Sequence, residues 1–227
     1  MSYSVKEVFY TLQGEGLRAG RPAVFCRFAG CNLWNGREED RYSAVCRFCD
    51  TDFVGTDGTL GGKYNAAELA ALVAAQWPQT EHGRSSGAIP YVVLTGGEPM
   101  LQVDQVLIDA LHAQGFEIAV ETNGTLPVPM GPQGIDWVCV SPKAGADWVQ
   151  RRGHELKLVY PQPALMPTSV ESRAEQNGPS SPNFEHWLLQ PMDGPLQALH
   201  TKQAIAYCQA HPRWRLSVQT HKVLAIR

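Results

Sequence analysis

Short apolar runs alternate along the chain with longer stretches in which apolar residues recur at helical spacing. Most of the short runs are rich in Val, Ile or Leu, which is typical of strands in a parallel sheet covered by helices. The pattern predicts strands at residues 23–28, 91–94, 117–120, 137–140, 155–159, 187–189 and 216–219. It predicts helices at residues 66–76, 103–114 and 196–210.

Two of these helices carry end signals. Asn65 precedes the first helix as an N-cap, and Gly115 follows the second, where the chain must leave the helix. Between the elements, polar or Pro-, Gly- and Ser-rich stretches predict loops at residues 34–45, 78–87 and 161–182. The alternation predicts an α/β fold of βα units. We expect a partial, shortened TIM-like barrel with an expanded loop, because 227 residues are few for eight such units.

Length and charge narrow the classes of function. A chain of 227 residues with 44% hydrophobic residues can bury one substantial core, so residues 1–227 are expected to form a single domain. The net charge of −3 and the pI near 6.2 argue against a nucleic-acid partner and favour small-molecule chemistry. We see no signal peptide and no apolar stretch long enough for a membrane span, so we expect a cytoplasmic protein with reduced thiols.

Three cysteines near the N-terminus are the strongest chemical signal. Two residues separate Cys46 from Cys49, and Cys31 precedes them across the loop at residues 32–45. Iron-sulfur clusters are usually held by four cysteinates, so three thiolates would leave one iron open to bind another molecule. The remaining cysteines, Cys26, Cys139 and Cys208, lie in apolar or helical settings and are expected to pack rather than to bind metal.

Three other uses of the cysteines fit the sequence less well. A thioredoxin-like pair needs no third cysteine, and a zinc nucleobase deaminase needs a His-x-Glu motif that the chain lacks. A structural zinc site stays open, because Cys26 or a histidine could supply a fourth ligand. No second pair of ligands follows at the spacing of a zinc finger, which counts against it.

Polar clusters follow four of the predicted strands. In a barrel of βα units the chemistry gathers where strands end and loops begin. Paired glycines permit close approach of the backbone to a ligand, and the adjacent Glu98 could face an ammonium group or only solvent. The clusters are Thr95-Gly96-Gly97-Glu98-Pro99, Glu121-Thr122-Asn123-Gly124, Ser141-Pro142-Lys143 and Gln190-Pro191-Met192-Asp193.

These motifs resemble a known family from end to end. The cysteine triplet, Phe48 before the last cysteine and the Gly96-Gly97-Glu98 run resemble the radical S-adenosylmethionine superfamily. The opening Phe9-Tyr10-Thr11-Leu12-Gln13-Gly14-Glu15-Gly16 and the closing Gln219-Thr220-His221-Lys222 resemble the 7-carboxy-7-deazaguanine synthases within it. The spacing of Cys31 and Cys46 departs from the usual CxxxCxxC, although a longer loop adds closure entropy only slowly.

The resemblance implies three cofactors. Cys31, Cys46 and Cys49 would hold a 4Fe-4S cluster, whose open iron chelates S-adenosyl-L-methionine. The residues implied to position that cofactor are Phe48, Cys49, Asp50, Gly97, Ser141, Pro142, Lys143, Gln190, Pro191, Met192 and Asp193. A magnesium ion would lie at Thr51, with substrate oxygens completing much of its coordination, as suits a hard cation.

The implied substrate is 6-carboxy-5,6,7,8-tetrahydropterin, which the family converts to 7-carboxy-7-deazaguanine by a radical ring contraction with loss of ammonia. Arg27 would offer a bidentate guanidinium to the carboxylate, with a surface ion pair as the alternative. Arg227 would contribute through its terminal carboxylate, and His221 from the end of the final strand. The full implied set is Leu12, Gln13, Gly14, Glu15, Arg27, Thr95, His221 and Arg227.

The resemblance also implies partners. A reductant protein such as flavodoxin or ferredoxin would supply the electron, and the family often forms homodimers. Two other functions stay open at this point. A radical activase of a glycyl-radical enzyme would share the cofactor but require an open groove for protein, and a structural zinc module would hold no iron.

Overall fold

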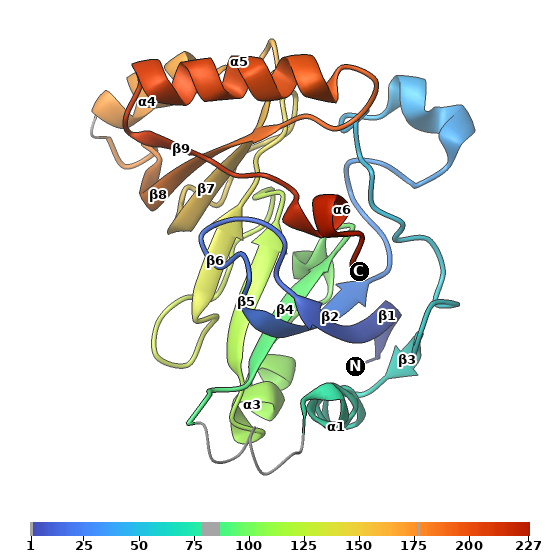
Figure 1. Ribbon diagram of the computed structural model, residues 1–227. Helices are drawn as coiled ribbons and strands as arrows, with labels where there is room; N and C mark the ends of the chain where they lie inside the picture. Colours follow the sequence, from blue (N-terminus) through green and yellow to red (C-terminus); the bar gives the residue numbers. More distant parts are fainter. Residues whose placement is uncertain (1, 79–86, 177) are drawn as a thin grey trace.

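The computed structural model describes residues 2–78, 87–176 and 178–227. Nine strands form one sheet in the order β3-β1-β2-β4-β5-β6-β7-β8-β9 (Figure 1). Every neighbouring pair from β2 to β9 is parallel, whereas β1 runs antiparallel to both β2 and β3. The strands are β1 Tyr3–Leu12, β2 Pro22–Phe28, β3 Gly62–Tyr64, β4 Tyr91–Gly96, β5 Glu117–Thr122, β6 Trp137–Val140, β7 Arg152–Tyr160, β8 Asn183–Pro191 and β9 Trp214–Leu216.

Helices cover one face of the sheet, where their buried residues share a single core. In Figure 1, α1 and α3 lie near each other beside β1, β2 and β5, whereas α5 lies across the part of the sheet that carries β8 and β9. The α-helices are α1 Ala66–Gln76, α3 Gln105–Ala113, α4 Pro167–Glu175, α5 Gln197–Ala210 and α6 Thr220–Leu224. The described residues also form two 3-10 helices, η1 Glu38–Ser43 and η2 Pro99–Leu101.

The predicted α/β class is confirmed, and the pairing order defines an open sheet. Its edge strands β3 and β9 do not pair with each other, so the described residues form no closed barrel. Six predicted strands coincide with β2 and β4 to β8, and β6 matches residue for residue. The prediction at residues 216–219 is wrong, because β9 ends at Leu216 and the chain then turns into α6.

The end signals of the helices are confirmed. The Asn65 side chain accepts a hydrogen bond from the Glu68 amide at 3.0 Å, and the Glu68 carboxylate accepts one from the Asn65 amide at 2.9 Å, which makes a full capping box. Gly115 follows α3 with φ +81°, and its amide donates to the His112 carbonyl at 2.8 Å.

Two predicted loops contain helices. The loop at residues 161–182 holds α4, and the loop at residues 34–45 holds η1. Pro167 opens α4 at its first turn, where the missing N–H is harmless, so a residue taken as a loop signal here begins a helix. The third predicted loop, at residues 78–87, lies mostly outside the described residues.

The two faces of the sheet bury different amounts of apolar surface. Successive strand residues point to opposite faces, so Val92 and Leu94 join the large core beneath α1 and α3, whereas Tyr91 and Val93 belong to a small cluster on the other face. The predicted packing of Cys26 and Cys139 is confirmed, since both side chains are buried.

Polar residues replace apolar ones toward the carboxyl ends of the strands on that second face. The register places Arg27 beside Thr95, and Glu121 beside Cys139, which in turn lies beside Glu155. A row of polar side chains therefore crosses the sheet one layer above the small apolar cluster. This row is the floor of the candidate site.

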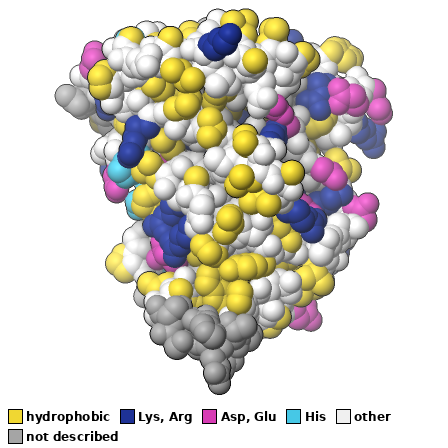
Figure 2. Space-filling model, in the orientation of Figure 1, with side chains coloured by type: hydrophobic (Ala, Val, Ile, Leu, Met, Phe, Trp, Pro, Cys, Tyr) yellow, Lys and Arg dark blue, Asp and Glu magenta, His cyan; other side chains and the backbone are white. Residues whose placement is uncertain are grey.

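Charges of both signs are mixed on the face of the molecule that Figure 2 draws. Figure 2 shows Lys and Arg side chains interspersed with Asp and Glu on the face drawn, among the residues that it colours. This distribution agrees with the net charge of −3. Within the described parts of the chain, no helix combines the length and apolarity needed to cross a membrane.

Leu107 on α3 provides a test of the large core. Its side chain is fully buried, whereas the adjacent Val106 is 63% exposed. We expect Leu107→Ala to lower the free energy of unfolding by about 2–5 kcal/mol, because it removes buried methyl groups and leaves a cavity. Val106→Ala, the matched control, should change it by less than about 0.5 kcal/mol. Denaturant unfolding measures both, and equal effects would contradict the packing of α3.

Candidate active site

A cavity opens at the carboxyl ends of the parallel strands. All three cysteines of the N-terminal triplet line it, together with residues from each of the four strand-end clusters. Parallel strands end at one edge of a sheet, so clusters far apart in the chain meet there. The lining residues include Cys31, Cys46, Phe48, Cys49, Asp50, Thr51, Thr95, Gly97, Asn123, Ser141, Lys143, Gln190, Pro191, Asp193 and Gln219.

The loop between the first two cysteines closes on itself. The Leu33 carbonyl accepts hydrogen bonds from the Val45 amide at 3.1 Å and the Cys46 amide at 3.3 Å. The fourteen residues at 32–45 therefore leave and return at one point, which brings Cys31 close to Cys46. The loop also supplies Leu33 and Trp34 to the cavity lining.

Arg41 ties this loop to the turn that carries the other two cysteines. Its Nη1 donates to the Arg47 carbonyl at 3.1 Å and to the Cys49 carbonyl at 3.0 Å. The guanidinium stacks over the Trp34 ring, 4.0 Å from the ring centre, and its Nε donates to Glu38 at 2.8 Å. The loop and the Cys46–Cys49 turn are thus held as one unit.

The cysteines differ in acidity. A hydrogen bond with Cys46 lowers the pKa of Cys49 to about 6, against the effect of burial, and the Thr51 amide contributes in the same direction. The same hydrogen bond and burial raise the pKa of Cys46, while burial raises that of Cys31. Lys143 lies near enough to Cys46 and Cys49 to favour their thiolate forms.

Gly97 permits the closest approach in the site. A Cβ at this position would lie 2.1 Å from the Gly30 carbonyl oxygen and 2.7 Å from the Cys31 Cβ, so only glycine fits against the first cysteine. Glu98 faces neither an ammonium group nor solvent, the two positions that the sequence suggested for it. It is fully buried and accepts hydrogen bonds from Thr122 Oγ1 and the Asn123 amide, each at 2.7 Å, which joins the ends of β4 and β5.

A second cavity adjoins the first. It is lined by all eight residues that the sequence implied for the substrate, namely Leu12, Gln13, Gly14, Glu15, Arg27, Thr95, His221 and Arg227. Glu15, Asp50, Thr51, Thr95, Glu121 and Gln219 line both cavities and form their common wall.

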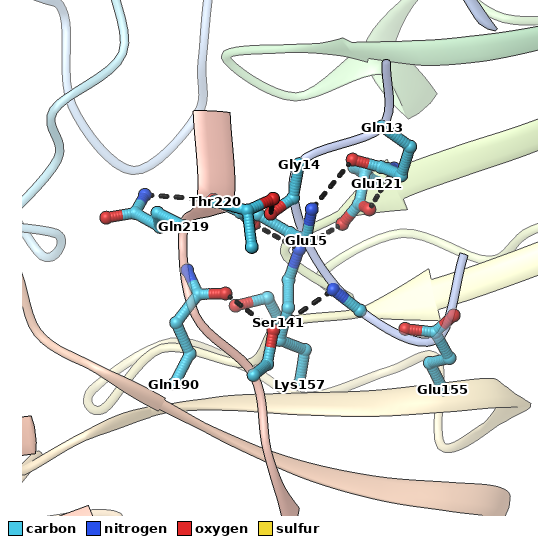
Figure 3. Close-up of polar contacts among 12 residues, drawn as sticks. Gln13, Gly14, Glu15, Glu121, Ser141, Glu155, Lys157, Gln190, Gln219 and Thr220 are labelled. Atoms are coloured by element: carbon cyan, nitrogen blue, oxygen red, sulfur yellow. Dashed lines mark hydrogen bonds and ion pairs between the residues drawn. The ribbon is translucent and has the colours of Figure 1, made fainter. Parts of the chain in front are cut away.

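A buried cation organises this wall (Figure 3). Lys157 Nζ donates to Glu15 Oε2 at 2.5 Å and to Glu121 Oε2 at 2.7 Å, and only 5% of the Lys157 side chain is exposed. Gln219 Nε2 donates to the other oxygen of Glu15 at 2.8 Å, and Gln13 Nε2 to that of Glu121 at 3.3 Å. Two carboxylates around one ammonium leave a net negative charge on the wall.

The same contacts set the ionisation of Glu15 and Lys157. Burial alone would raise the pKa of Glu15, but the charge and hydrogen bond of Lys157, with Gln219, lower it to about 2. Burial opposes the charge of Lys157, yet Cys139, Glu121 and Glu15 raise its pKa well above its usual value. Glu15 is therefore ionised at neutral pH.

Glu155 lies at the other end of this row and is differently placed. It accepts hydrogen bonds from Trp137 Nε1 at 2.6 Å and from the Leu17 amide at 3.4 Å, and no cation pairs with it among the described residues. Burial, and then repulsion from Glu121, raise the pKa of Glu155 to about 7. It supports the loop after β1 from below.

Not every implied residue reaches a cavity. Pro142 and Met192 lie in the expected strand-end loops but line neither cavity. Arg27 lines the second cavity and also pairs with Glu7 at 2.9 Å, so the ion pair is confirmed and the role in binding substrate stays a prediction. His221 reaches the cavity from α6 and not from a strand, and burial lowers its pKa.

Sequence reasoning missed Lys157, Glu155 and Lys222. A signal for the first two was present, since Glu155 and Lys157 alternate within a run that predicts a buried strand. Charged side chains are rarely buried unless they are paired. Lys222 belongs to the closing motif Gln219-Thr220-His221-Lys222, but nothing in the sequence pairs it with Asp50 or Asp193.

The cysteine set suits an iron-sulfur cluster better than a single metal ion. Among the described residues, no group of three or more His, Cys, Asp or Glu converges on one metal position. The thiolates of a cluster bind separate irons, so they need not converge in that way. Three cysteines line one cavity, one of them with a low pKa, and Lys143 favours the thiolates.

An open α/β sheet that gathers three cysteines, a Gly-Gly-Glu turn and polar strand ends around one cavity defines a class, the radical S-adenosylmethionine enzymes. A scan against models of protein families found no match. The chain is 63% identical over 228 residues to the 7-carboxy-7-deazaguanine synthase of Bradyrhizobium diazoefficiens and 60% identical over 227 residues to that of Bordetella pertussis, each pair covering 100% of both sequences. Among solved structures, QueE from Escherichia coli matches with a TM-score of 0.68 and 28% identity over 97% of this chain and 95% of that one.

The chain belongs to the 7-carboxy-7-deazaguanine synthase family. It is an enzyme of the radical S-adenosylmethionine class, which uses a 4Fe-4S cluster and S-adenosyl-L-methionine. This resolves the alternatives left open by the sequence in favour of the synthase over the activase and the zinc module.

The raised pKa of Glu155 predicts a pH dependence of stability. A carboxyl with a pKa of about 7 when folded and 4.5 when unfolded binds its proton more tightly in the folded state. Protonated Glu155 therefore contributes fully to the free energy of unfolding below about pH 4.5, and this contribution is lost as the pH rises through about 7. We expect Glu155→Gln to be more stable relative to the unaltered protein at pH 8 than at pH 5, by up to about 3 kcal/mol. Denaturant unfolding at both values measures the difference, and a pH-independent difference would contradict the assignment.

Proposed function

We propose that residues 1–227 act as one domain that converts 6-carboxy-5,6,7,8-tetrahydropterin to 7-carboxy-7-deazaguanine with loss of ammonia, a step of queuosine biosynthesis. The observation that carries the proposal is the pair of adjacent cavities, one lined by the three cysteines and the other by Arg27 and carboxylates. The membership of the family supports this reaction. We describe the open sheet as a partial, shortened barrel, with both cavities at the carboxyl ends of its parallel strands.

The first cavity is proposed to bind the cofactors. Cys31, Cys46 and Cys49 would ligate the 4Fe-4S cluster, since all three line this cavity. The Gly97 backbone can approach the methionyl amine, because it carries no side chain. The remaining proposed contacts with S-adenosyl-L-methionine are Phe48, Asp50, Ser141, Pro142, Lys143, Gln190, Pro191, Met192 and Asp193, of which all but Pro142 and Met192 line the cavity.

The second cavity is proposed to bind the pterin. Arg27 can pair with the substrate carboxylate from one side, because Glu7 occupies only part of its guanidinium. On the other side, Glu15 presents an ionised carboxylate to the amine and amide edge of the ring. Leu12, Gln13, Gly14, Thr95, His221 and Arg227 would complete the contacts.

Thr51 is proposed to hold the magnesium ion. It lines both cavities and lies between Asp50 and Asp52, which line the pterin cavity with it. Hard cations prefer such oxygen ligands. An ion at this point could bind oxygen atoms of the substrate beside the cofactor.

The cofactors, when bound, supply a carbon-centred radical that takes hydrogen from the substrate. The chain fixes the pterin so that one carbon faces the first cavity, which is a gain of proximity and orientation. Lys157 keeps Glu15 ionised, and its hydrogen bonds hold Glu15 and Glu121 on the common wall. The loop at residues 32–45, with Leu33 and Trp34 in the lining, limits access of water and oxygen.

Further aspects of the function rest on the family. We propose that a reductant protein such as flavodoxin or ferredoxin supplies the electron, that the chain forms a homodimer and that it works in the cytoplasm. No nucleic acid or membrane is needed for this chemistry.

An anaerobic assay tests the proposed reaction. Protein reconstituted with iron and sulfide, given a reductant, S-adenosyl-L-methionine, magnesium and the pterin, should form a product lighter by one ammonia in mass spectrometry. Cys46→Ala should abolish the product, because one cluster ligand is lost, whereas Cys208→Ala, on α5, should not. Cleavage of S-adenosyl-L-methionine without turnover of the pterin would refute the substrate and leave the class of enzyme intact.

A second test addresses recognition of the substrate carboxylate. We expect Arg27→Met to raise the KM for the pterin by roughly 10- to 100-fold, because a charge-assisted hydrogen bond is lost. Arg27→Lys should recover part of the loss, since it keeps the charge without the bidentate geometry. Arg173→Met, an exposed arginine on α4, is the matched control. A KM for the pterin equal in the Arg27 and Arg173 variants would rule out this role.

A further inference from the structure

The C-terminal segment, defined as residues 217–227, joins the substrate cavity to the loop after β1. The Thr220 amide and hydroxyl donate to the Gly14 carbonyl at 2.9 Å and 2.8 Å, and Figure 3 shows Thr220 beside Gly14. Ser217 Oγ accepts a hydrogen bond from the Gly16 amide at 3.0 Å. The segment contributes Gln219, His221, Lys222 and Arg227 to the lining of the substrate cavity.

Lys222 links this segment to both sides of the cofactor cavity. Its Nζ forms ion pairs with Asp50 Oδ2 and, at 2.6 Å, with Asp193 Oδ2. Asp50 directly follows the last cysteine, Cys49, and Asp193 follows β8. Both aspartates line the cofactor cavity, whereas Lys222 lines the substrate cavity.

Without Lys222, Asp50 and Asp193 would lose the cation that pairs with both of them. The negative charges of Asp50 and Asp193 would then no longer be balanced by the ammonium that they share. Between the segment and Asp50, the described contact that remains would be the hydrogen bond from Gln219 at 3.2 Å. The Lys222 side chain is 33% exposed and those of Asp50 and Asp193 are 39% and 34% exposed. Solvent therefore weakens each pair, and the role of Lys222 is to set positions more than to stabilise the fold.

We propose that Lys222 is a positioning residue, which holds the C-terminal segment against the Cys46–Cys49 turn and the end of β8. The positions of the segment's side chains in the substrate cavity then depend on the positions of Asp50 and Asp193 in the cofactor cavity. The inference rests on the proposed roles of the two cavities. Lys222 does not line the cofactor cavity, in which the three cysteines lie. A ligand that moves Asp50 or Asp193 would, through Lys222, move His221 and Gln219 at the pterin.

Three variants test this role in the reconstituted enzyme. Lys222→Met removes the charge and keeps most of the length, Lys222→Arg keeps both ion pairs, and Lys202→Met replaces an exposed lysine on α5 as the control. Hydrogen exchange of residues 217–227 without the pterin is the first measurement. The KM for the pterin, compared with kcat and with the KM for S-adenosyl-L-methionine, is the second.

The proposal expects faster exchange of the segment in Lys222→Met and a KM for the pterin raised about three- to tenfold, with a smaller change in kcat. Lys222→Arg and Lys202→Met should behave as the unaltered enzyme. Unchanged exchange, or faster exchange with an unchanged KM for the pterin, would overturn it. If the unaltered enzyme does not turn over the pterin, the proposed function fails, and the exchange measurement still decides whether Lys222 holds the segment.

Discussion

The site depends on one electrostatic constraint, the burial of the Lys157 ammonium within the sheet. An unpaired charge in this position would cost several kcal/mol, so it must be met by carboxylates with satisfied hydrogen bonds. One of these is Glu121 of β5 and the other is Glu15 from the loop after β1. That loop is therefore held over the end of the sheet, and Gln219 and Gln13 complete the arrangement from the C-terminal segment and from the same loop. The wall between the two cavities follows from the need to neutralise this cation.

The loop at residues 32–45 is held mainly by hydrogen bonds to backbone carbonyls. The Leu33 carbonyl closes the loop at residues 32–45, and Arg41 binds it to the Cys46–Cys49 turn. A loop of that length costs little more closure entropy than a short one. The departure from the usual cysteine spacing thus leaves the triplet together and adds two apolar residues, Leu33 and Trp34, to the cofactor cavity.

Much of the fold and of the site could be predicted. Six strands and three helices were recognised from apolar periodicity, because buried parallel strands and their covering helices give strong local patterns. The clustering of the strand-end residues was also predictable, since parallel strands end at one edge. By contrast, β1 was missed because its alternation is broken by a register shift between Val5 and Glu7, and the short edge strand β3 has too few residues to give a pattern. The pattern at residues 216–219 predicts a strand, but the chain leaves the sheet at Leu216.

The sequence by itself determined the α/β class, the cysteine triplet, the helix caps and the motifs that mark the family, because each of these is written in residues that lie close together in the chain. The tertiary structure alone decided the pairing order of the strands, the burial of Glu98 between the ends of β4 and β5, and the ion pairs of Lys157 and Lys222. Lys157 is 142 residues from Glu15, and Lys222 is 172 residues from Asp50. Contacts over such separations depend on how the whole chain packs, and no local periodicity encodes which charge will meet which.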